Sequence, residues 1–166
     1  MTGFLHRGRR YVQTAAAVVM LGAAFAAFSA TASEAGSSSF QLRGTFQNIS
    51  NFSCPASPIG TCSSFNSIGV IHGSGVVVVD GFFPPPSPSG LSNAMTTIHT
   101  NRGDLMCSDL AIFDLASSDH PFVDQCTITG GTGHYAGATG FIQESGTFDF
   151  ANNVGQADYE GKLVLP

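Results

Sequence analysis

The sequence predicts an all-β protein, either a sandwich or a barrel, and three observations support this. Short segments with alternating apolar and polar residues are separated by clusters of turn residues along most of the chain. No stretch after residue 32 shows a convincing helical period. Five glycines within residues 130–140 lie between a β-branched segment and an alternating one, which is the pattern of a strand, a tight corner and a second strand.

The first 32 residues have the pattern of a secretory signal peptide. Three arginines in residues 7–10 precede an apolar stretch at 15–28 and an Ala-Thr-Ala cleavage pattern at 30–32. We expect cleavage after Ala32, with Ala35 as the second choice. The apolar stretch is short for a membrane span of about 20 residues, which disfavours an uncleaved anchor. The sequence therefore predicts a secreted or periplasmic protein.

Residues 33–166 suit one domain, with a flexible lead at 33–39 and the domain itself at 40–166. All 11 acidic residues of the chain follow Ala32, whereas Arg43, Arg102 and Lys162 are the basic residues in this part. A body this acidic repels phosphate groups, so we expect no nucleic-acid partner and no binding to an anionic membrane surface.

The predicted strands follow from alternation and from β-branched or aromatic content. In chain order they cover residues 40–47, 68–81, 94–100, 105–115, 122–129, 141–150 and 155–165. Residues 48–66 are predicted as a loop, and the proline-rich stretch at 83–90 as a second one. Four consecutive valines at 76–79 make one strand apolar on both faces. Such a strand is either central or covered by another subunit.

The four cysteines predict two disulfide bonds, because an even number in an oxidising compartment usually pairs. Three pairings are possible, and we favour Cys54 with Cys62 and Cys107 with Cys126. The second bond would join two antiparallel strands whose register centres near Ala116 and Ser117, and would stabilise by roughly 3 kcal/mol on the loop-entropy model. Zinc is the alternative, but the chain has no C-x-x-C or H-x-x-x-H spacing, so no metal site is predicted.

The glycine-rich run carries a family resemblance. The run GGTGHYAGATG resembles the GGTGxYxGAxG signature of the allene oxide cyclase barrel-like family, a relative of the plant dirigent proteins, and HTNRGDL at residues 99–105 is similar to the middle of that family. The signature residues are Gly130, Gly131, Gly133, Tyr135, Gly137 and Gly140. No GxGxxG or phosphate-binding loop pattern occurs, which disfavours nucleotide binding. The resemblance implies a closed antiparallel barrel of about eight strands, assembly into trimers and no cofactor.

Several polar side chains fall on apolar strand faces, and they form the predicted site. Glu144 alternates with apolar residues of its strand, Asp124 does the same in the preceding strand, and Tyr159 is the polar end of an apolar face in the last strand. We predict a barrel pocket lined by Glu144, His72, Tyr159 and His99. A carboxylate in such a pocket has a raised pKa. In the alternative, Glu144 lies near a rim or bonded to backbone, or the register differs by one residue.

Three functions remain open at this point. The leading hypothesis is non-catalytic binding of a hydrophobic small molecule inside the barrel. The second is a cofactor-free cyclase or isomerase that holds a flexible substrate in one reactive shape. The third is a surface or structural protein whose barrel is filled with side chains. No catalytic residue is assigned, and of these we favour a protein that is not an enzyme.

Overall fold

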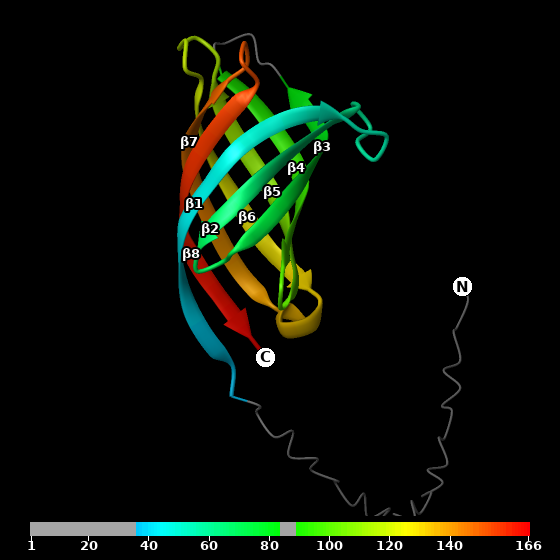
Figure 1. Ribbon diagram of the computed structural model, residues 1–166, viewed down its shortest axis with the longest axis vertical. Coiled ribbons are helices and arrows are strands. Elements are labelled where there is room, and N and C mark those ends of the chain that lie inside the picture. The colour runs from blue at the N-terminus through cyan, green and yellow to red at the C-terminus, as the bar shows by residue number, and fades with distance from the viewer. Residues whose placement is uncertain (1–35, 84–88) are drawn as a thin grey trace, which may run out of the picture. The chain divides into compact units, whose positions relative to one another are not determined.

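The chain folds into a closed barrel of eight antiparallel strands that follow one another in sequence order, with β1 also paired to β8 (Figure 1). The computed structural model describes residues 36–83 and 89–166. The predicted signal peptide therefore lies outside the described residues, as does most of the proline-rich loop. The strands are β1 (Ser38–Ser53), β2 (Thr61–Gly69), β3 (Gly73–Phe83), β4 (Ser89–Thr100), β5 (Gly103–Asp114), β6 (Pro121–Gly131), β7 (Thr139–Asp149) and β8 (Val154–Leu165). The prediction of a closed barrel of about eight strands is confirmed.

Two predicted boundaries near the start of the barrel are wrong. The predicted loop at 48–66 is mostly strand, because β1 continues to Ser53 and β2 begins at Thr61. Its serines and asparagines still pair through their backbones, after a bulge between Gln47 and Ser50. The predicted single strand at 68–81 is instead divided by a turn at 70–72. A Cβ at Gly73 would lie 1.9 Å from a backbone oxygen of β4, so the chain needs glycine where β3 begins.

The end of the barrel that contains the glycine-rich corner is filled by side chains. A short 3-10 helix, η1 (Gly133–Tyr135), connects β6 to β7 and buries the Tyr135 ring. Glycine is required here: a Cβ at Gly131 would lie 2.3 Å from the Asp104 carbonyl oxygen. Buried residues from several strands complete this packed end; they include Leu42, Ile71, Ile98, Leu105, Ile128, Ile142, Leu163 and Leu165. Among the described residues, no helix is long and apolar enough to cross a membrane.

Tyr159 of β8 belongs to this packed core. Its ring stacks on Phe46 with a centroid distance of 4.6 Å. Its hydroxyl donates to the carbonyl oxygen of Ile71 at 3.2 Å and accepts from the Ile71 amide at 3.1 Å. The phenol therefore satisfies both the amide and the carbonyl group of Ile71 in the β2–β3 turn.

The structure places both predicted cysteine pairs at disulfide distance. Cys107 and Cys126 lie inside the barrel with a Cα–Cα distance of 5.4 Å. The predicted register is wrong, however, because Cys107 lies opposite Ile128 and Cys126 lies opposite Asp109. The strands pair about a point between residues 117 and 118, one residue later than predicted, and a bulge follows Met106. The bond therefore runs diagonally between β5 and β6.

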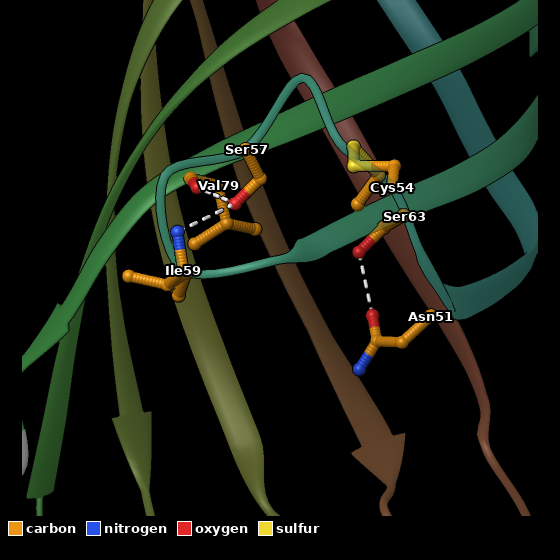
Figure 2. The surroundings of a disulfide bond; sticks show 7 residues. Asn51, Cys54, Ser57, Ile59, Ser63 and Val79 are labelled. Atoms are coloured by element: carbon orange, nitrogen blue, oxygen red, sulfur yellow. Dashed lines mark hydrogen bonds between the residues drawn. A yellow bond between two sulfur atoms is a disulfide. The ribbon is translucent and has the colours of Figure 1, made fainter.

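The second pair, Cys54 with Cys62, closes a short loop on the outside of the barrel (Figure 2). The Ser57 hydroxyl donates to the Val79 carbonyl oxygen and accepts from the Ile59 amide, which holds the loop against β3. Nearby, the Ser63 hydroxyl donates to the Asn51 side-chain oxygen at 2.5 Å, so β1 and β2 are joined where their inward side chains meet a cavity.

Candidate functional site

A cavity of about 110 Å³ lies inside the barrel beside the packed end. Every strand except β8 contributes to its wall, and most of the lining is aromatic or aliphatic. Six phenylalanines take part: Phe46, Phe65, Phe113, Phe122, Phe148 and Phe150. Phe150 is 43 % exposed, so the cavity reaches the surface near the β7–β8 turn. The barrel is therefore filled at one end and hollow toward the other.

Three carboxyl groups face this cavity from neighbouring strands. Alternation along β5, β6 and β7 turns Asp109, Asp124 and Glu144 to the inside. Asp124 and Glu144 are direct cross-strand partners, and Asp109 lies two residues from Ala111, the β5 partner of Asp124. Direct partners have Cβ atoms about 5 Å apart and diagonal ones about 7–8 Å. The three acids thus form one wall of the pocket.

Burial raises the pKa of all three groups, and charge repulsion adds to this for Asp109 and Glu144. Burial, followed by the charge of Asp124, raises the pKa of Asp109 to about 7. Burial also raises the pKa of Asp124 to about 6, although the backbone amides of Gln125 and Leu110 oppose this. Glu144 is half-buried as a residue, and the enclosure of its carboxyl group, with the charges of Asp124 and Asp109, raises its pKa well above the usual value. Part of the cluster is therefore protonated at neutral pH.

Two of the carboxyl oxygens have no hydrogen-bond partner. They are Oδ2 of Asp109 and Oδ1 of Asp124, and both are shielded from solvent. An unpaired buried acceptor costs about 1–3 kcal/mol. The pocket thus combines an apolar surface with acceptor atoms that lack donors.

The structure brings one of the four predicted pocket residues to the cavity. Glu144 lines it, whereas Tyr159 lies in the packed core next to it. His72 and His99 lie on the exposed surface, outside the pocket. His99 shares its outward face with exposed Met95, and its ring nitrogen lies 2.8 Å from Asp104. Their predicted place in the pocket is not what the structure shows.

The misplacement of His72 has a local cause. The prediction treated Ile68 and Val70 as an inward apolar face, but both are exposed, at 44 % and 61 %. They stand where β2 ends and the turn begins, so alternation does not continue into β3.

Asp109 was missed by the sequence analysis. It alternates with Leu105 and Cys107, both fully buried, so the signal that identified Asp124 and Glu144 was present in β5 as well. The carboxyl lies beside the Cys107–Cys126 bond: the two sulfurs and a carboxylate oxygen of Asp109 lie within 4.8 Å of one another. Because the sulfurs are bonded to each other, they are not thiolate ligands, and this group does not hold a metal in its oxidised form.

Comparisons with known proteins return one structural match. No protein-family model matches the chain, and no curated protein matches it. Among solved structures, a pterocarpan synthase dirigent protein matches with a TM-score of 0.45 and 17 % sequence identity, over 77 % of this chain and 88 % of that chain. The match is to a dirigent protein, and the allene oxide cyclase part of the resemblance stays a prediction. At this similarity the function is inferred from the pocket itself.

Proposed function

We propose that this protein binds a small, largely apolar molecule in the barrel pocket, in an oxidising compartment outside the cytoplasm. The observation that carries the proposal is the cavity of about 110 Å³, with its phenylalanine lining and its unpaired carboxyl oxygens. Binding sites are commonly apolar clefts with a few convergent polar groups of perturbed pKa. The paired cysteines fit an oxidising compartment.

The energetics of the pocket favour binding over a purely structural role. Protein interiors are close-packed, and voids larger than a water molecule are few. A barrel that served only as a scaffold would be more stable with apolar side chains in place of Asp109 and Asp124, because each of them has an unpaired buried acceptor, which is unfavourable. A ligand that fills the cavity would remove the empty space, and its hydrogen-bond donors would pair with the unpaired carboxyl oxygens.

The test is a titration of the full chain with three compact one-ring probes: benzyl alcohol, benzylamine and benzoate. We expect saturable one-to-one binding of at least one probe by calorimetry. The Ala94→Leu variant, which fills part of the cavity from β4, should weaken that binding by about tenfold or more. Ser145→Leu, on the exposed face of β7, is the matched control and should bind as the wild type does. Absence of binding by all three probes contradicts the proposal.

A cofactor-free cyclase or isomerase is the second candidate. The pKa of Asp109 near 7 favours it, because a carboxyl that keeps its proton at neutral pH can act as a general acid toward a substrate held against it. A pocket of this kind would also hold a flexible substrate in one reactive shape. The same binding experiments separate the two candidates: a bound compound recovered chemically changed indicates an enzyme, and one recovered intact indicates a binder.

A further inference from the structure

Among the residues that the structure describes, no cation lines the cavity that the carboxyls of Asp109, Asp124 and Glu144 face. The cavity lining contains no lysine, arginine or histidine side chain. Within residues 36–83 and 89–166 the arginines and the lysine are exposed, and the one ion pair, between His99 and Asp104, lies at the surface. Burial of unpaired negative charge is strongly unfavourable. These groups therefore either keep protons or share a cation that comes from outside the chain.

A second observation points to a ligand with several donors. Asp109 is only 7 % exposed, lines the cavity, and has a carboxyl oxygen with no hydrogen-bond partner. Asp124 also lines the cavity and has a second buried carboxyl oxygen without a partner. Buried acceptors without donors are rare in native proteins. The wall formed by these strands thus offers separate acceptor atoms that a group with several N–H bonds would satisfy.

A single metal ion does not fit the three carboxyls. In the part of the chain that the structure describes, the one group of three potential ligand atoms within 4.8 Å of one another is Cys107, Asp109 and Cys126, and its sulfurs form a disulfide. Asp124 and Glu144 are not part of it. An ammonium group carries three N–H donors that point in different directions, so it can reach acceptors that do not converge on one point.

The other residues that line the cavity determine the size and the apolar character of the rest of the ligand. The ring centroids of Phe113 and Phe122 lie 5.3 Å apart, and these residues are two positions along their strands from Ala111 and Asp124. Aromatic faces stabilise both apolar groups and cations. The cavity of about 110 Å³ is of the same order as an engineered cavity of about 150 Å³ that takes benzene. The space therefore suits a body of about one ring.

We infer that the ligand of this pocket is a compact primary amine with a body of one apolar ring or a short branched chain, an inference that rests on the proposed binding function. Its ammonium group donates to Asp124 and Glu144 and directs a third N–H to Asp109. Its apolar body packs on the phenylalanines that line the cavity.

This mode of binding depends on pH. The side chains that face the acids from β4, such as Ser92, Ala94 and Thr96, do not titrate. The same holds for the lining residues of β1, β2 and β3. From β8, Tyr159 lies opposite Glu144, but its hydroxyl is engaged by Ile71. Because burial keeps protons on the empty cluster, an incoming ammonium displaces them. Affinity should therefore increase from pH 5 to pH 8, with release of protons to the buffer.

The experiment compares benzylamine, benzyl alcohol and benzoate as ligands of the full chain at pH 8. We expect benzylamine to bind about tenfold more tightly than benzyl alcohol, since charge-assisted hydrogen bonds are about twice as strong as neutral ones. Benzoate should not bind detectably. The variant Asp124→Asn/Glu144→Gln should reduce the preference for the amine to within about twofold. The matched control, Asp158→Asn/Glu160→Gln on the exposed face of β8, should keep it.

A second measurement covers the case in which the pocket variant does not fold. Calorimetry of benzylamine with the wild type at pH 6, in two buffers of different ionisation enthalpy, should reveal net proton release. Absence of release overturns the inference, as does a preference for the amine that survives in the pocket variant. If benzyl alcohol binds as tightly as benzylamine, the inference falls and the proposed function stands. If none of the three probes binds, both fall.

Discussion

At the scale of single residues, Asp109 shows how one carboxyl changes the character of a barrel interior. It lies between the buried Cys107–Cys126 bond and the cavity, and its neighbour across the wall is another acid. Raising a carboxyl pKa from 3.8 to about 7 corresponds to roughly 4 kcal/mol between the ionised and protonated forms. The group thus destabilises the empty protein at neutral pH and leaves that free energy available to a ligand.

The stability of the empty protein should reflect this group. The folded state holds the Asp109 proton more tightly than the unfolded chain, so the contribution of Asp109 is most favourable at low pH. It is lost as the pH rises from about 4 to about 7. We therefore expect Asp109→Asn to increase the free energy of unfolding at pH 8 by roughly 1–4 kcal/mol and to change it little at pH 4.

Urea denaturation at the two pH values measures this difference. Asp158→Asn, an exposed carboxyl on β8, is the control and should leave the free energy of unfolding unchanged at both. A variant at position 109 that is equally stabilised, or equally destabilised, at pH 4 and pH 8 would show that the carboxyl does not titrate abnormally.

At the scale of elements, the corner between β6 and β7 depends on glycine for two separable reasons. Gly130 and Gly140 both have positive φ, at 148° and 132°. A Cβ at Gly130 would meet nothing within 4 Å, whereas one at Gly140 would lie 1.9 Å from the carbonyl oxygen of Lys162. Gly130 is needed for its positive φ alone, whereas Gly140 is needed both for its positive φ and because a side chain would collide with β8.

Substitution by alanine should therefore destabilise the protein by different amounts at Gly130 and Gly140. Gly130→Ala should cost about 1–2 kcal/mol, the backbone strain alone. Gly140→Ala should cost more, because the β7–β8 ladder must also move. Chemical denaturation of the two variants measures the difference in the free energy of unfolding. Equal losses would mean that β8 moves away from Gly140 at no cost, contrary to the close approach of Gly140 to the Lys162 carbonyl oxygen.

At the scale of the whole molecule, the pairing of β1 with β8 closes the barrel. The register runs from Ser38 with Leu165 to Ile49 with Gly155, so the last strand lies along most of the first (Figure 1). Leu163 and Leu165 extend from β8 into the packed end and are 5 % and 7 % exposed. Closure leaves neither strand as an open edge, which limits pairing with other chains.

Removal of residues 163–166 should therefore open the barrel. Loss of two buried leucines costs about 1.5–3 kcal/mol each, and the start of β1 also loses its partners. We expect a strong increase in the fluorescence of a dye that binds exposed apolar surface, together with loss of a cooperative unfolding transition. Deletion of the exposed Pro166 alone is the control. A cooperative transition after the larger deletion would contradict the closing role of β8.

Local pattern was sufficient to predict the strands from β5 to β8, the later part of β4 from Ala94, and the inward direction of Glu144 and Asp124. Period-2 alternation fixes which face a side chain takes once the strand is known. Local pattern was misleading at two places. Ile68 was predicted to begin a strand, but β2 ends at the next residue, Gly69. At Met106 a bulge displaces the register of β5 and β6. Asp109 was also missed, although the alternation was present.

The cavity itself could not be derived from the sequence. Whether six phenylalanines fill a barrel or leave a space depends on ring orientations and on the distance across the barrel, which are properties of the three-dimensional packing. The missing counter-charge also depends on the folded structure, because only the arrangement of all the strands shows that no arginine or lysine of the described residues lines the cavity.

The filled end of the barrel has a kinetic consequence. Leu42, Ile71, Tyr135 and their neighbours pack across one end, so in the described part of the chain the cavity lies away from that end, on the side of Phe150. A ligand of the proposed kind would therefore have no path through the packed end and would have to enter and leave on the same side of the barrel. Its residence time would then depend on how often the phenylalanine side chains on that side rotate out of its path.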